Sequence, residues 1–83
     1  MMKYRAKKSL GQNFLINPRV AEHMVLESNI SKKDTVLEVG PGTGNLTKYL
    51  LARAKKVIAV EKDENLAKEL AEKFQKEIKN EKL

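Results

Sequence analysis

Three glycines stand at alternate positions within residues 40–44, whose sequence is Gly-Pro-Gly-Thr-Gly. Glycine adopts backbone conformations that other residues avoid, and it has no Cβ atom to keep a ligand away from the main chain. The segment follows the β-branched, mostly apolar stretch 35–39 and precedes Leu46 and Leu50, which recur at helical spacing. We therefore expect a strand, a glycine loop against which a ligand can lie, and then a helix.

Glu61 ends a second apolar run, residues 57–60, and stands 21 positions after Gly40. A carboxylate about 20 positions after such a loop is placed to accept hydrogen bonds from the hydroxyls of a ribose. The alternative for Glu61 is a surface acid near a helix start, but Asp63 already fits the capping position. The loop alone also fits an ordinary tight turn, whereas the loop and Glu61 together predict a nucleoside-binding site.

The glycine spacing indicates which nucleoside is bound. The third glycine of the dinucleotide fingerprint would fall at position 45, which is Asn45, and no Gly-Lys-Ser/Thr follows to form a P-loop. A close backbone and a ribose acceptor without a phosphate cradle fit S-adenosylmethionine. Glu38, just before the loop, then either faces the cationic methionine end of this cofactor or is an ordinary surface acid at the strand end.

Composition limits the other chemistry. The 83 residues contain no cysteine and one histidine, so disulfides, cysteine nucleophiles and thiolate metal sites are excluded and we expect no metal. No apolar run approaches the roughly 20 residues of a membrane span, and no secretion-signal pattern follows the basic N-terminus. We therefore expect a cytoplasmic protein that binds no membrane.

Positive charge gathers at the start of the chain. The whole sequence carries a formal charge of +6, and its first 19 residues hold five basic side chains and no acidic one. Such a segment releases counterions when it binds a nucleic-acid backbone. We expect RNA contact from Lys3, Arg5, Lys7 and Lys8. The alternative is a solubilising tail.

The element order is predicted to be helix, strand, helix, strand, helix. Asn17 and Pro18 look like a helix start, and Asp63 begins a long helix. The run 57–60 is typical of a strand covered on both faces. The buried side of the last helix is expected to contain Leu66, Ala67, Leu70, Ala71, Phe74 and Ile78.

This order predicts an α/β fold, half of a Rossmann-like sheet, with two parallel strands joined by a right-handed crossover. Two parallel strands leave both edges of the sheet unpaired, and such a pair is rarely stable alone. We therefore expect the chain to be a piece of a longer protein, and to self-associate or bind a partner through its open strand edges.

Three segments resemble the N-terminal part of the ribosomal RNA adenine dimethyltransferases. They are residues 8–15 (Lys-Ser-Leu-Gly-Gln-Asn-Phe-Leu), 36–44 (Val-Leu-Glu-Val-Gly-Pro-Gly-Thr-Gly) and 60–63 (Val-Glu-Lys-Asp), within a similarity over roughly residues 7–75. The Gly-Gln-Asn-Phe-Leu block is the most specific part, since many methyltransferases share the loop. The resemblance implies a partial class I methyltransferase fold that uses S-adenosylmethionine to dimethylate N6 of two adjacent adenines near the 3′ end of small-subunit rRNA.

The resemblance also implies roles for individual residues. Asn13 and Leu15 would close over the cofactor, Gly40 would approach it through its backbone, and Glu61 would hold the ribose. Further cofactor-binding candidates, as neighbours in the same motifs, are Gln12, Glu38, Gly42 and Gly44. The chain then divides into a basic segment with the cofactor-lid motif, residues 1–16, and the first half of the cofactor-binding domain, residues 17–83.

Two motifs that the resemblance leads one to expect are missing from the 83 residues: the acid of a third strand, near the cofactor adenine, and an Asn-Leu/Ile-Pro-Tyr motif after a fourth. An adenine amine is a poor nucleophile, so the enzyme must accept its hydrogens and stack the flipped base. We therefore expect no catalytic residue in this chain and no methylation by it alone. The alternatives are a large-subunit rRNA methyltransferase of the antibiotic-resistance type and a non-catalytic RNA-binding or assembly module.

Overall fold

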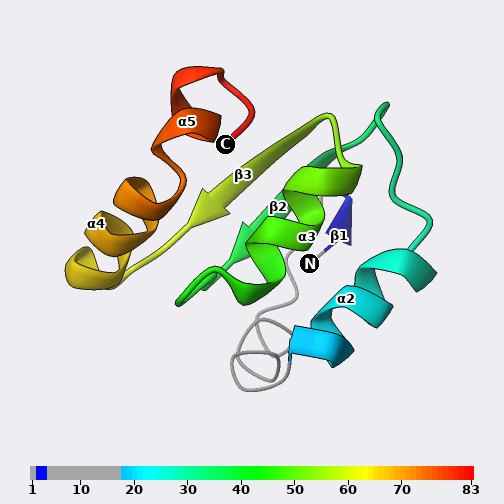
Figure 1. Ribbon diagram of the computed structural model, residues 1–83, viewed down its shortest axis with the longest axis horizontal. Helices are drawn as coiled ribbons and strands as arrows, with labels where there is room; N and C mark the ends of the chain where they lie inside the picture. Colours follow the sequence, from blue (N-terminus) through cyan, green and yellow to red (C-terminus); the bar gives the residue numbers. More distant parts are fainter. Residues whose placement is uncertain (1, 4–17) are drawn as a thin grey trace.

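The computed structural model describes residues 2–3 and 18–83, with side chains described for 18–83. The elements are β1 (Met2–Lys3), α2 (Pro18–Glu27), β2 (Thr35–Val39), α3 (Asn45–Arg53), β3 (Lys56–Val60), α4 (Glu64–Lys73) and α5 (Gln75–Lys79) (Figure 1). β2 and β3 pair in parallel, with Thr35 opposite Lys56 and Val39 opposite Val60. The predicted α/β fold and its parallel strand pair are therefore confirmed.

A third strand was not expected from the sequence. β1 pairs antiparallel with β2, with Met2 opposite Leu37, so the order in the sheet is β1-β2-β3. A strand of two residues is too short for the period-2 alternation by which strands are recognised in a sequence. Its pairing places the start of the chain along one edge of β2.

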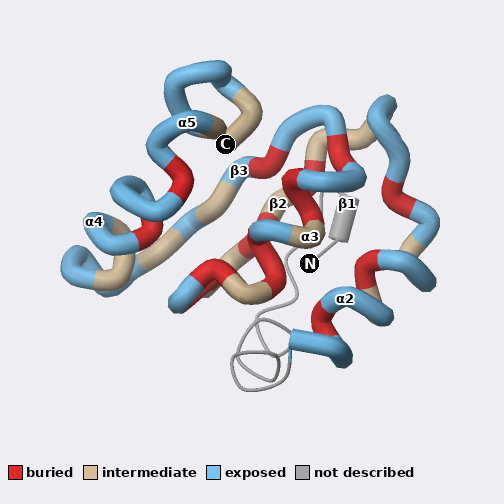
Figure 2. Tube along the Cα trace, viewed as in Figure 1, coloured by how far each residue is buried: buried red, intermediate tan, exposed pale blue. Residues whose placement is uncertain are grey.

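The first helix starts where Pro18 predicted, because proline at the first helical position gives up no intrahelical hydrogen bond. Asn17, its predicted cap, lies outside the described residues. α2 packs against α3 and buries Ala21 and Val25 in the core. Figure 2 shows the buried positions of α2 on the side that faces α3.

The helices of the described residues cover one face of the β2–β3 pair. Val36, Glu38 and Val57 are buried on this face, whereas Ile58 and Val60 on the other face are 48% and 51% exposed. The expectation that the run 57–60 is covered on both faces is therefore wrong for this chain. An alternating strand sends successive side chains to opposite faces, and the face that carries Ile58 and Val60 has no described helix packed on it.

The single long helix expected after Asp63 is two helices. Its start is as predicted, because the Asp63 carboxylate accepts hydrogen bonds from the backbone N–H groups of Asn65 and Leu66, at 2.8 and 3.1 Å. At Phe74 the backbone leaves helical geometry, with φ −114° and ψ 30°, and α5 begins. Because of this break, fewer of the six apolar side chains are buried than expected. Leu70 and Phe74 are buried, Leu66 and Ala67 are half-buried, and Ala71 and Ile78 are exposed.

Candidate cofactor site

The site lies where β2 and β3 end side by side. The N–H of Gly40 donates to the carbonyl oxygen of Val60 at 2.9 Å, which joins the first residue after β2 to the last residue of β3. Gly40 has φ +71°, a left-handed conformation that residues with a side chain rarely adopt, and a Cβ atom added there would meet nothing within 4 Å. The main chain at Gly40 therefore borders open space.

The structure brings Glu61 to this loop. Its Oε1 accepts a hydrogen bond from the N–H of Gly42 at 3.0 Å, and its Oε2 accepts one from the N–H of Asp63 at 2.9 Å. A carboxylate offers about four lone-pair positions, so two hydrogen bonds leave it able to accept from further donors. Glu61 is half-buried, and its carboxylate is fixed at the mouth of the glycine loop.

Gly44 has a packing reason for being glycine. It precedes α3 with φ +87°, and a Cβ atom there would lie 2.7 Å from a ring carbon of Phe74 and 2.9 Å from a methyl carbon of Leu70. Its N–H donates to the carbonyl oxygen of Pro41 at 2.9 Å, which closes the turn. Gly44 thus lets α4 pack against the start of α3. This contact is enough to explain why residue 44 is glycine, and no ligand is needed to account for it.

Glu38 is not the surface acid that one interpretation of the sequence expected. It is 1% exposed, on the helix-covered face of β2, and its Oε1 accepts a hydrogen bond from Oγ1 of Thr47 at 2.5 Å. Its Oε2 has no hydrogen-bond partner among the described residues. Burial raises the pKa of the Glu38 carboxyl, and the hydrogen bond from Thr47 opposes that rise.

Thr47 is the functional-site residue that sequence reasoning missed. It is fully buried in the first turn of α3, among leucines at positions 46, 50 and 51. A threonine on the apolar side of a helix is a weak signal, because its partner Glu38 lies in another element. The pair fixes α3 to β2 directly beneath the glycine loop.

Several predicted site residues lie outside the described part of the chain. They are Gln12, Asn13 and Leu15 of the lid motif and Arg5, Lys7 and Lys8 of the basic segment. Lys3 lies in β1, but its side chain is not described. Within the described residues, no three His, Cys, Asp or Glu side chains form a group that would hold a metal ion, and no helix has the length and hydropathy of a membrane span.

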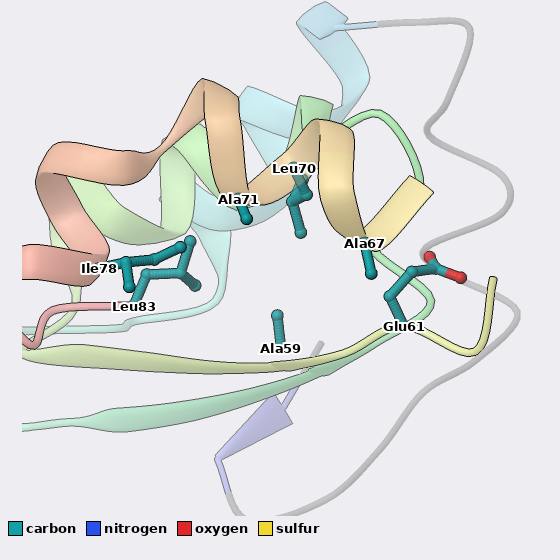
Figure 3. Close-up of a pocket in the computed structure, with 7 residues that line it drawn as sticks. All are labelled: Ala59, Glu61, Ala67, Leu70, Ala71, Ile78 and Leu83. Atoms are coloured by element: carbon teal, nitrogen blue, oxygen red, sulfur yellow. The ribbon is translucent and has the colours of Figure 1, made fainter. Parts of the chain in front are cut away.

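An apolar groove of about 330 Å³ extends from Glu61 along β3. It is lined by Ala59, Glu61, Ala67, Leu70, Ala71, Ile78 and Leu83. Figure 3 shows α4 and α5 above the groove and β3 below it, with the Glu61 carboxylate at one end and pointing away from the apolar side chains. At the other end the N–H of Val57 donates to the carbonyl oxygen of Lys82 at 2.8 Å, so the C-terminal residues lie along the free edge of β3.

The fold of the chain has a counterpart among solved structures. The crystal structure of a dimethyladenosine transferase from Plasmodium falciparum superposes with a TM-score of 0.67 and 39% sequence identity, over 74% of this chain and 22% of that one. The fold is therefore that of a Rossmann-like methyltransferase.

The sequence comparisons then identify the family. The family described as "Ribosomal RNA adenine dimethylase" matches residues 3–83, and the chain belongs to this family, as the resemblance predicted. "Ribosomal RNA small subunit methyltransferase A" of Pelagibacter ubique is 57% identical over 76 residues, covering 90% of this chain and 29% of that protein. "Dimethyladenosine transferase" of Yarrowia lipolytica is 50% identical over 80 residues, covering 96% of this chain and 25% of that protein. The chain thus spans between a quarter and a third of the length of these relatives.

Proposed function

We propose that this chain is the S-adenosylmethionine-binding N-terminal part of a ribosomal RNA adenine N6,N6-dimethyltransferase. Its substrate would be two adjacent adenines near the 3′ end of small-subunit rRNA. The names of the relatives, a small-subunit methyltransferase and a dimethyladenosine transferase, support this substrate over the large-subunit alternative. The structural observation that carries the proposal is the Glu61 carboxylate, held 3.0 Å from the Gly42 amide at the mouth of the loop.

The residues present fit the adenosyl part of this cofactor. The open space beside Gly40 allows a ribose to approach the main chain, and the remaining lone pairs of Glu61 can accept hydrogen bonds from both ribose hydroxyls. The amides of Gly42 and Asp63 hold the Glu61 carboxylate before the ligand arrives, which lowers the entropic cost of binding. The bound cofactor would supply the electrophilic methyl group.

Glu38 is proposed to face the cationic methionine end. A buried carboxylate oxygen without a hydrogen-bond donor is costly, and a cationic ligand nearby would stabilise it. Because Thr47 holds the other oxygen of Glu38, its carboxylate can turn only little. From the resemblance we further propose that Gln12, Asn13 and Leu15 close over the cofactor and that the basic segment contacts rRNA.

In this proposal, the acceptor adenine is bound by residues outside these 83. We propose that no catalytic residue lies in the chain and that it does not methylate RNA alone. A substrate of ribosomal RNA agrees with the cytoplasmic location expected from the sequence. The exposed side chains of Ile58 and Val60 and the apolar groove support the proposal that the isolated chain self-associates.

The proposed activity can be tested in a longer protein that carries this chain. Transfer of labelled methyl groups from S-adenosylmethionine to small-subunit rRNA is expected for that protein, and a loss of at least tenfold in kcat/KM for its Glu61→Ala variant. Salt-dependent RNA binding without cofactor binding or methyl transfer would instead identify a non-catalytic assembly module.

A further inference from the structure

A second concentration of positive charge extends from α3 to the end of the sheet that is opposite the glycine loop. It consists of Lys32, Lys48, Arg53, Lys76 and Lys82, which we call the basic cluster. Lys32 precedes β2, Lys48 and Arg53 belong to α3, Lys76 belongs to α5, and Lys82 follows it. The sequence gives no sign of this cluster, because its members are up to 50 positions apart.

Contacts in the structure join these residues. A hollow of about 370 Å³ is lined by Lys48, Leu51, Ala52, Lys76, Glu77, Asn80 and Lys82. Lys32 borders the same hollow, because its Nζ donates to the carbonyl oxygen of Ala52 at 2.9 Å. The side chain of Lys82 beside it, desolvation and the charge of Arg53 lower the pKa of Lys32. Two ammonium groups this close repel each other, so an anion between them would relieve the repulsion.

The charge of the cluster is poorly balanced. Glu77 is the acidic side chain that lines the hollow, against three lysines. The ion pair between His23 and Glu27 on α2 involves no member of the cluster. The dipole at the end of α3 favours cations such as Arg53 and Lys32, but it does not account for Lys76 or Lys82.

Lys32, Arg53 and Lys82 of the basic cluster lie away from the cofactor site, whereas Lys48 lies in the first turn of α3, where its N–H donates to the carbonyl oxygen of Gly44 at 3.2 Å. β2 and β3 are five residues long, so the first and last residues of each strand are about 13 Å apart. Figure 1 shows the C-terminus and the loop before β2 at one end of the sheet, and the loop between β2 and α3 at the other. A lysine ammonium group acts as a point charge without a fixed geometry, so a group of lysines can bind the repeated phosphates of a nucleic acid. Such phosphate contacts do not distinguish one base sequence from another.

We propose that the basic cluster binds the phosphate backbone of RNA, as a docking surface independent of the N-terminal basic segment and of the cofactor site. The choice of RNA over other polyanions rests on the proposed function. Lys32 and Lys82 would hold the substrate at the amino ends of the strands, while the cofactor occupies the carboxyl ends. Binding there is expected to be insensitive to base sequence and to weaken steeply with salt.

The test is fluorescence anisotropy with a labelled single-stranded RNA of mixed sequence at several salt concentrations. The cluster variant carries Lys32→Gln and Lys82→Gln, and the matched control carries Lys62→Gln and Lys68→Gln, two exposed lysines outside the cluster. For the cluster variant, the slope of log K against log salt should fall by about 1.4, at about 0.7 per phosphate contact. The control should change the slope much less.

A second variant, Lys48→Gln with Lys76→Gln, covers the other wall of the hollow and should act like the first. Its side chains donate none of the hydrogen bonds given above, so folding should be retained. Equal losses in the cluster and control variants, or no loss in either cluster variant, would overturn the proposal. Calorimetry with S-adenosylmethionine on the same proteins separates this proposal from the proposed function. If the cluster variants lose RNA binding and none of the proteins binds the cofactor, the result supports the basic cluster and contradicts the proposed function.

Discussion

Glu61 and Gly42, nineteen positions apart, are joined by a hydrogen bond of 3.0 Å from the Gly42 amide to the Glu61 carboxylate. This bond ties the end of β3 to the loop after β2, and the Asp63 amide holds the other carboxylate oxygen. The acid that would receive a ribose is thus positioned by backbone groups alone. Substitution of other side chains in the loop should therefore leave the position of the Glu61 carboxylate largely unchanged.

Replacing Thr47 with valine is expected to destabilise the chain. Valine keeps the shape of threonine but removes the hydroxyl that donates to Glu38, which leaves a buried carboxylate with no donor among the described residues. The free energy of unfolding should fall by about 1–3 kcal/mol. Urea unfolding followed by circular dichroism measures the change, and Thr47→Ser, which keeps the hydroxyl, should lose less. Equal stability of the wild type and Thr47→Val would show that the hydrogen bond contributes nothing.

The stability contributed by Glu38 should depend on pH. Burial raises the pKa of Glu38 in the folded chain above its ordinary value of 4.5, so between the two values the folded state binds more protons than the unfolded state. Stability then falls as pH rises. Its contribution is fully present below about 4.5 and is lost as pH rises through the raised folded pKa.

Glu38→Gln provides the reference for this prediction, because glutamine can still accept from Thr47 and does not titrate. The unfolding free energy of the wild type minus that of Glu38→Gln should decrease between pH 4.5 and pH 7.5 in urea titrations. Groups common to both proteins cancel in this difference. An increase over the same range would mean that Glu38 is stabilised in its charged form, opposite to the effect of its burial.

Gly40→Ala and Gly44→Ala form a matched pair. Both positions have positive φ, so each alanine should cost about 1–3 kcal/mol in backbone strain. Only at Gly44 does the added Cβ also collide with Phe74 and Leu70, so Gly44→Ala should be clearly the less stable in thermal unfolding. Gly40→Ala should instead fold and bind S-adenosylmethionine more weakly, since its Cβ fills the open space. Equal stability of the two variants would contradict the packing explanation for Gly44.

Local patterns predicted much of this structure. The β-branched, mostly apolar run 35–39, Pro18 at a helix start and the Asp63 cap depend on neighbouring residues, and each is found where expected. The exposed Ile58 could not be predicted, because an apolar strand sequence does not show which faces are covered in a given chain. The Glu38–Thr47 pair and the basic cluster were missed for a related reason: both join residues from different elements.

The ribose assignment of Glu61 is tested most directly by isothermal calorimetry with S-adenosylmethionine. The proteins to compare are the wild type, Glu61→Gln and the control Glu69→Gln, which changes an exposed glutamate on α4. Hydrogen bonds to a charged group contribute about 1.5–3 kcal/mol each, so Glu61→Gln should weaken binding about tenfold or more, while Glu69→Gln leaves it unchanged. Wild-type affinity in a folded Glu61→Gln protein would contradict the assignment of this carboxylate to the cofactor ribose.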